Sequence, residues 1–204
     1  MKVVYVHMMC LLVLVAIACQ NPEQIIETWE DGQPRKVLVK DKAGDLEINY
    51  YQNGEKESEG GKLQDKKEGL WEYFDEQGNV RERTHYRAGQ PFGASELFFE
   101  NGMKKSVSYY DESGLRSELW MEYDKNGRLR SKGQYESGSK LGLWAYYSES
   151  GVIAREEYIL KADEWKYLKE YDENGSLKYY LEFYPNGVNS IEKIRTDKEN
   201  RSQK

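Results

Sequence analysis

Short segments in which apolar and polar residues alternate run along most of the chain, separated by polar stretches that contain a glycine. The clearest example runs from Leu70 to Tyr86, where Trp71 and Tyr73 precede a polar turn closed by Gly78. Alternation with a period of two is typical of a β-strand that buries one face. The stretch therefore predicts a β-hairpin.

The same pattern returns at a fixed period of 24 or 25 residues. Six glycines close the predicted turns: Gly54, Gly78, Gly102, Gly127, Gly151 and Gly175. Four residues before each glycine stands an aromatic residue: Tyr50, Phe74, Phe98, Tyr123, Tyr147 and Tyr171. Seven residues before three of them stands a tryptophan: Trp71, Trp120 and Trp144. A period of this size is the signature of a repeat protein.

Asparagine often precedes the turn glycine, as in Asn101-Gly102 and Asn126-Gly127. Asn-Gly favours a type I′ turn, in which both central residues have positive φ, so we expect type I′ turns here. Between hairpins, a second motif places glycines four residues apart, as at Gly138 and Gly142.

A single hairpin is marginally stable in water, so neighbouring hairpins must share their aromatic side chains. We expect an all-β fold, an elongated antiparallel sheet of repeated hairpins over residues 29–188. Residues 19–28 are predicted to be a tether and residues 189–204 a charged C-terminal tail.

Residues 1–18 have the anatomy of an export signal, with one charged residue, Lys2, and a mostly apolar run that ends at Ala18. Cys19 follows small residues, which resembles the lipobox of bacterial lipoproteins. Cys10 leaves with the signal, so the mature chain has one cysteine and no internal disulfide. We expect lipidation at Cys19, with a soluble secreted product and an uncleaved anchor as alternatives.

The chain is acidic, with a formal net charge of −6. Without residues 1–18, which include one lysine and no acid, 29 basic residues stand against 36 acidic ones and the net charge is −7. This balance argues against nucleic acid as a partner. The 17 tyrosines and five tryptophans argue against disorder, because disordered chains are poor in aromatic residues.

The sequence gives little support for catalysis. Carboxylates such as Glu72 and Asp75 lie at turns and alternating strand positions, where a solvated face needs charge, although paired carboxylates also serve glycosidases. His85 is the one histidine outside the signal, too few for a standard zinc site. We expect no enzyme activity, no metal and no cofactor.

Some aromatic residues do not fit the repeat and are therefore candidates for binding. They are Phe99, Tyr109, Trp165, Tyr167, Tyr179 and Tyr180. The segment from Trp165 to Tyr180 holds the highest density of them.

The spacing Tyr135-x-x-Gly138-x-x-x-Gly142-x-Trp144-x-x-Tyr147 resembles the MORN repeat, in the longer-spaced variant found in bacterial proteins. The resemblance covers about residues 48–188 and extends to the YwqK-type antitoxin proteins. The copy after Gly114 departs from it, because no second glycine follows four residues later.

We therefore expect a membrane-anchored extracytoplasmic scaffold that binds another protein, in a bacterial envelope and with the outer membrane slightly favoured. The resemblance implies an immunity or antitoxin-like variant of this function. The alternative is a carbohydrate-binding or hydrolytic envelope protein that uses an exposed aromatic and acidic face.

Overall fold

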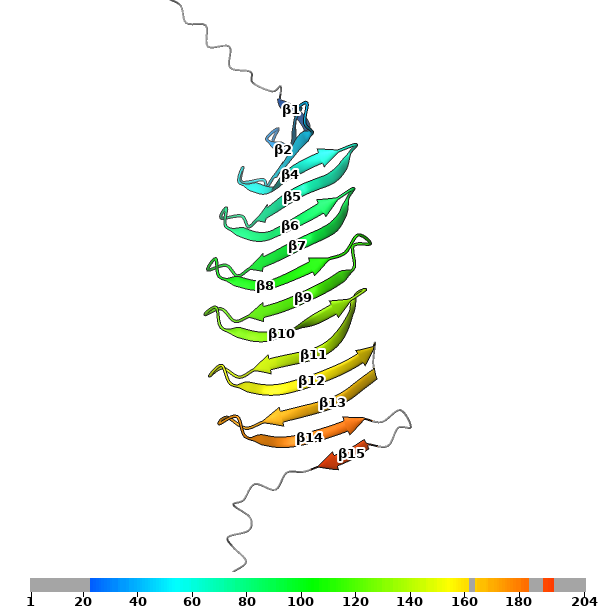
Figure 1. Ribbon diagram of the computed structural model, residues 1–204. Helices are drawn as coiled ribbons and strands as arrows, with labels where there is room; N and C mark the ends of the chain where they lie inside the picture. The colour runs from blue at the N-terminus through cyan, green and yellow to red at the C-terminus, as the bar shows by residue number, and fades with distance from the viewer. Residues whose placement is uncertain (1–22, 162–163, 184–188, 193–204) are drawn as a thin grey trace, which may run out of the picture.

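The computed structural model describes residues 23–161, 164–183 and 189–192, with Trp165 and the last four residues described by their backbone alone. These residues form one antiparallel sheet of fifteen strands, in which every strand pairs with its neighbours in sequence (Figure 1). The strands are β1 (Glu23–Thr28), β2 (Pro34–Val39), β3 (Asp45–Tyr50), β4 (Lys56–Leu63), β5 (Lys66–Phe74), β6 (Val80–Arg87), β7 (Gln90–Phe98), β8 (Lys104–Tyr110), β9 (Arg116–Tyr123), β10 (Leu129–Glu136), β11 (Ser139–Tyr147), β12 (Ile153–Lys161), β13 (Glu164–Tyr171), β14 (Leu177–Phe183) and β15 (Asn189–Glu192). The expected all-β sheet of repeated hairpins is confirmed.

The sheet extends beyond the predicted limits at both ends. Residues 23–28, expected to belong to the tether, form β1 and pair with β2. Residues 189–192, expected to belong to the tail, form β15 and pair with β14. The predicted signal and Cys19 lie outside the described residues.

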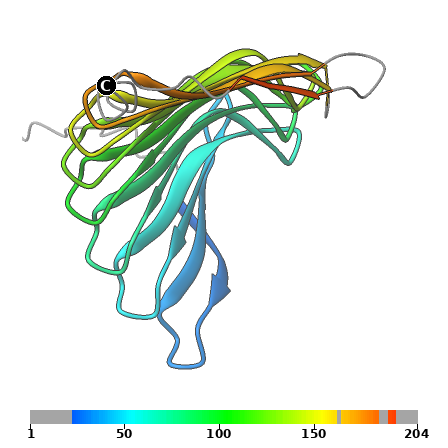
Figure 2. The ribbon, with the colours of Figure 1, turned by 90° about the horizontal axis from the view of Figure 1, so that it is seen from below.

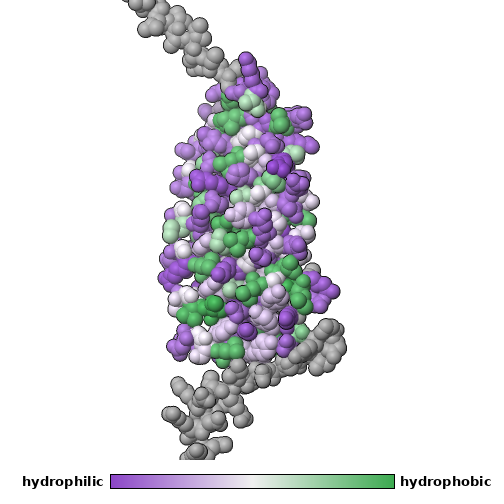
Figure 3. Space-filling view, in the orientation of Figure 1, coloured by the Kyte–Doolittle hydropathy of each residue, from purple (hydrophilic) through white to green (hydrophobic). Residues whose placement is uncertain are grey.

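The described residues form a single layer. Seen from below, the strands rotate progressively from β1 to β14, which is the twist expected of a sheet of L-residues (Figure 2). Apolar and hydrophilic residues are interspersed over the face that Figure 3 shows, as expected where no second layer covers a sheet. Burial must therefore come from contacts within the sheet.

Trp71 and Trp144 supply that burial, each with 1% of its surface exposed. Trp71 of β5 lies against Gly60 of β4, and Trp144 of β11 lies against Gly133 of β10. A Cβ atom at either glycine would overlap the indole ring. The missing side chain on one strand thus makes the space that the tryptophan of the next strand fills.

Each indole N–H also has a partner. Trp71 Nε1 donates to the carbonyl of Gly61 at 2.9 Å, and Trp144 Nε1 donates to the carbonyl of Gln134 at 3.1 Å. Both carbonyls lie where the register between the two strands shifts. The shift leaves a backbone acceptor for a donor that would otherwise be costly to bury.

Lysine and tyrosine cover the outer side of each indole. The Nζ atom of Lys67 lies 4.3 Å from the Trp71 ring centre and donates to the Tyr73 hydroxyl at 2.6 Å. Lys140 stands in the same way 4.0 Å above Trp144. Burial lowers the pKa of both lysines. We call the side of the sheet that holds Trp71, Trp120 and Trp144 the tryptophan face, and its reverse the opposite face.

The prediction of type I′ turns at the six repeat glycines was wrong. At the six turn glycines only the glycine has positive φ, and the preceding asparagines do not. In the β9–β10 turn the Asp124 carboxylate accepts the backbone N–H groups of Asn126 and Arg128, both at 2.9 Å. These bonds stabilise a longer loop, a type I turn followed by a left-handed glycine. Residue pairs with positive φ, typical of type I′ turns, occur on the other edge of the sheet, at Gln64-Asp65, Ala88-Gly89 and Ser137-Gly138.

The copy after Gly114 keeps the geometry of its neighbours although it lacks the second glycine. Gly93 and Gly142 have φ of 75° and 67°, and Glu118, at the matching position, has φ of 57°. A left-handed conformation costs an ordinary residue free energy that glycine does not lose. The repeat therefore holds Glu118 in a strained conformation.

Gly60→Ala is expected to destabilise the fold by about 1–3 kcal/mol, because the new Cβ displaces the Trp71 indole. The free energy of unfolding in urea is the measurement. The same substitution in a Trp71→Leu background should cost less, because the overlapping ring is gone. Equal losses of unfolding free energy in the two backgrounds would show that overlap with the Trp71 ring is not the cause of the destabilisation.

Glu118→Gly is expected to stabilise the protein by about 1 kcal/mol, because glycine adopts the left-handed conformation without strain. The midpoint of urea unfolding should rise. Glu122→Gly in the same strand is the control and should lower the midpoint, since Glu122 lies outside the positive-φ residues. A lower midpoint for Glu118→Gly would show that the side chain contributes more than the strain costs.

Candidate functional site

A row of exposed leucines crosses the opposite face of the sheet. Leu46, Leu70, Leu119 and Leu143 are 38%, 43%, 38% and 47% exposed. In its strand, each leucine comes directly before a residue on the tryptophan face. Because successive side chains of a strand alternate, all four leucines project to the opposite face. We call these four residues the leucine stripe.

The stripe has the period of the repeat. Its members come from β3, β5, β9 and β11, and the same phase gives Ala94 in β7 and Tyr167 in β13. Alternate strands of a sheet lie about 10 Å apart, so the stripe presents an apolar side chain at nearly regular intervals. Exposed apolar patches of this kind mark contact surfaces.

Tyrosines extend the stripe toward β14. Leu143 lies opposite Tyr158, which lies opposite Tyr167. The ring centres of Tyr158 and Tyr167 are 5.7 Å apart, and those of Tyr167 and Tyr180 are 6.3 Å apart. Burial raises the pKa of Tyr167 above its ordinary value.

The six candidate aromatic residues do not form one site. Tyr167 and Tyr180 are in contact, and Tyr109 projects to the same face from β8 through its pairing with Ala94. Tyr179 projects to the other side of β14, because it precedes Tyr180 along the strand. Phe99 lies in the β7–β8 turn. The side chain of Trp165 lies outside what the structure describes.

Sequence reasoning missed the leucine stripe, although its signal was present. The leucines recur at the period of the turn glycines, one residue before the tryptophan position. A leucine in an alternating strand reads as a core residue, and only the single layer shows that this side of the sheet is uncovered.

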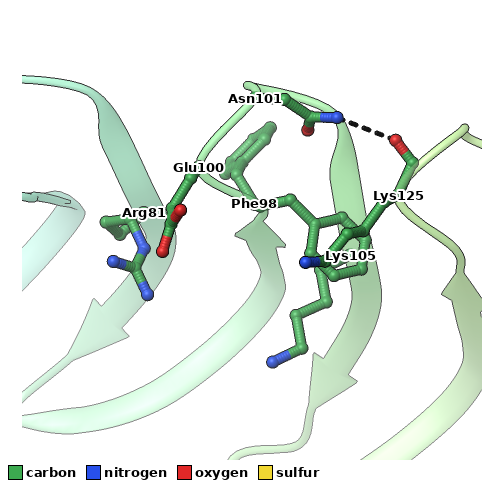
Figure 4. Close-up of a pocket in the computed structure, with 7 residues that line it drawn as sticks. Arg81, Phe98, Glu100, Asn101, Lys105 and Lys125 are labelled. Atoms are coloured by element: carbon green, nitrogen blue, oxygen red, sulfur yellow. Dashed lines mark hydrogen bonds between the residues drawn. The ribbon is translucent and has the colours of Figure 1, made fainter.

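A pocket of about 360 Å³ lies at the edge formed by the turns that close at the six repeat glycines (Figure 4). Its lining comes from β6, the end of β7, the β7–β8 turn, the start of β8 and the β9–β10 turn: Arg81, Phe98, Phe99, Glu100, Asn101, Lys105 and Lys125. We call it the turn-edge pocket. Its volume is within the range of small-molecule sites.

One hydrogen bond joins the two turns that border this pocket. Asn101 Nδ2 donates to the carbonyl of Lys125 at 2.8 Å (Figure 4). The equivalent bond between Asn53 and the carbonyl of Glu76 is 2.9 Å long. Two of the asparagines before the turn glycines, Asn53 and Asn101, therefore hold neighbouring turns together.

Several strand carboxylates have structural partners. Glu72 pairs with Arg83 at 2.7 Å. Glu157 is buried, pairs with Arg155 and accepts a hydrogen bond from Tyr146. Glu156 accepts from Tyr171 at 2.6 Å, and burial with this bond raises the pKa of Tyr171 to about 12.

No group of three or more metal-ligating side chains stands together among the described residues. Within the same part of the chain, no helix meets the length and apolarity needed to cross a membrane.

A family model described as "MORN repeat variant" matches residues 67–88 and residues 167–183. No curated protein matches the chain. One similar solved structure is a mutant TarM from S. aureus in complex with Fondaparinux, alpha-GlcNAc-glycerol and UDP. It is 13% identical, with 52% of this chain and 21% of that chain covered and a TM-score of 0.36, a likeness that carries no argument. The chain thus spans about a fifth of that structure's length. From the family match, the chain carries the MORN repeat variant in β5–β6 and in β13–β14.

Proposed function

We propose that this repeat protein is a scaffold that binds another protein through the leucine stripe, held at a bacterial envelope membrane by a lipid on Cys19. The observation that supports the binding role is the exposure of Leu46, Leu70, Leu119 and Leu143 in one phase of the repeat. An apolar row on an uncovered sheet face is favourable to bury against a partner.

The shape of the stripe favours a long partner surface. Leu46 and Leu70 lie on alternate strands about 10 Å apart, as do Leu119 and Leu143, and Ala94 holds the place between the two pairs. This spacing is close to the rise of two turns of an α-helix. An amphipathic helix of the partner, lying along the stripe, would place an apolar residue near each leucine. The expected partner is therefore a protein with an exposed amphipathic helix.

A narrower form of the proposal makes the partner a toxin that acts outside the cytoplasm. Its support is the resemblance of the repeat to the YwqK-type antitoxin proteins. Such a role is stoichiometric and needs binding alone.

Leu143→Glu is expected to weaken the complex about tenfold or more, because it places a charge within an apolar contact. A photo-crosslinking residue at position 119 would capture the partner, and the affinity of the purified pair is then measured. Leu63→Glu is the matched control, since Leu63 is 54% exposed but lies beside the Gln64-Asp65 turn, away from the stripe.

Equal losses in Leu143→Glu and Leu63→Glu would contradict the stripe as the contact surface. Glycan binding that is lost in Tyr167→Ala and kept in Leu143→Glu would instead support the carbohydrate-binding alternative, because sugars stack on aromatic rings such as Tyr158 and Tyr167.

Cys19→Ala is expected to move the protein from the membrane fraction to the soluble fraction, because it removes the predicted lipid attachment site. Cys10→Ala is the control, since Cys10 lies inside the predicted signal and should leave attachment unchanged. Fractionation after a high-salt wash is the measurement. Firm attachment of the Cys19→Ala protein would refute the lipid anchor.

A further inference from the structure

The turn-edge pocket lies where the repeat departs from its own pattern. Two residues before its turn glycine, the β9–β10 turn carries Lys125. The other five turns carry Gln52, Glu76, Glu100, Glu149 and Glu173 at that position. Three residues before the glycine, Asp75, Asp124 and Asp172 accept backbone hydrogen bonds in three turns. The other three turns have Tyr51, Phe99 and Ser148 at that position. Lys125 is the one basic residue among the six at its own position, and it lines the pocket together with Phe99.

The β7–β8 turn lacks the bond that an aspartate supplies. The aspartates hold their turns through side-chain hydrogen bonds to the backbone, and phenylalanine has no acceptor to offer. Asn101 closes the turn at Gly102 instead, since its Oδ1 accepts from the N–H of Met103 at 3.1 Å, as Asn53 Oδ1 accepts from the N–H of Glu55 in the turn at Gly54. The reversed charge at Lys125 is therefore the departure that turn closure does not explain, and such a departure in a repeat indicates a functional site.

The pocket is positively charged in an acidic protein. Arg81, Lys105 and Lys125 line it together with one carboxylate, that of Glu100. None of the three cations is in an ion pair among the described residues, whereas neighbouring Arg83 and Lys104 pair with Glu72 and Glu96 at 2.7 Å and 2.6 Å. Figure 4 shows these charged side chains arranged around Phe98. Unpaired cations beside a concave surface attract an anion.

Aromatic side chains give the pocket a second kind of contact. Phe98 and Phe99 are neighbours in sequence and both line it. Arg83 stands 5.4 Å from the Phe98 ring centre, and Lys105 stands 5.9 Å from that of Phe99. The pocket thus joins cations to ring surfaces, which suits a ligand with an anionic group on a ring or apolar body.

We propose that the turn-edge pocket binds an organic phosphate, with the phosphate held by Arg81, Lys105 and Lys125 and the body of the ligand on Phe98 and Phe99. A phosphate group offers several acceptor oxygens, so three cationic side chains can each bind one. The site is separate from the leucine stripe and does not depend on the protein partner.

The test measures binding of phenyl phosphate to the full chain by calorimetry. Lys125→Glu should weaken binding about tenfold or more, since a charge-assisted hydrogen bond is replaced by repulsion. This variant restores the residue that four sibling turns carry, so the turn should still fold. Lys178→Glu is the matched control, because Lys178 stands at the position of Lys105 in another repeat and outside the pocket.

Phe99→Ala should weaken binding of phenyl phosphate and leave binding of inorganic phosphate unchanged. A second arm of the test uses vesicles that contain an anionic phospholipid. If the protein binds both phenyl phosphate and these vesicles, and Lys125→Glu weakens the binding to the vesicles, the phosphate is that of a lipid headgroup. The proposal is overturned if phenyl phosphate does not bind, if Lys125→Glu and Lys178→Glu weaken it equally, or if inorganic phosphate binds as tightly as phenyl phosphate.

Discussion

The contact on which the sheet depends is a tryptophan ring lying against a glycine of the preceding strand. A single layer has no second sheet or helix layer to cover its apolar side chains, so each repeat must make a buried volume within its own surface. Gly60 opens that volume for Trp71 and Gly133 opens it for Trp144, and Lys67 and Lys140 close it from outside. Since ring and glycine come from different strands, the contact also joins the strands it lies between. Stability is thus a sum of neighbour contacts, as in other repeat proteins.

The irregular backbone positions serve this packing. Register shifts beside Gly61 and Gln134 leave the carbonyls that accept the indole N–H groups. The left-handed residues Gly69 and Gly142 lie in the strands that carry the tryptophans. Glu118 adopts the same conformation without the freedom of glycine, which shows that the repeat geometry outweighs the preference of one residue.

The positions that the packing does not use are where a repeat protein is free to vary. The leucine stripe occupies a phase that no buried contact requires, on a face that nothing covers within the described residues. Lys125 replaces the glutamate that four of the other turns carry, and Phe99 stands where three of them have an aspartate. Exceptions to a repeat are informative because its other copies show what the fold alone requires.

The sequence by itself determined the repeat, its period and the class of fold, because glycine and aromatic spacing act locally and recur in every copy. It did not determine the turn type, because side-chain bonds from Asp124 in one turn and from Asn101 in another hold a three-residue loop and outweigh the preference of Asn-Gly for a two-residue one. It also could not tell that Leu143 is exposed while Trp144 is buried, since both look apolar in an alternating strand. That difference, and the meeting of Arg81, Phe99 and Lys125 at one pocket, was decided by the tertiary structure, because the turns of successive repeats come side by side only when the sheet forms.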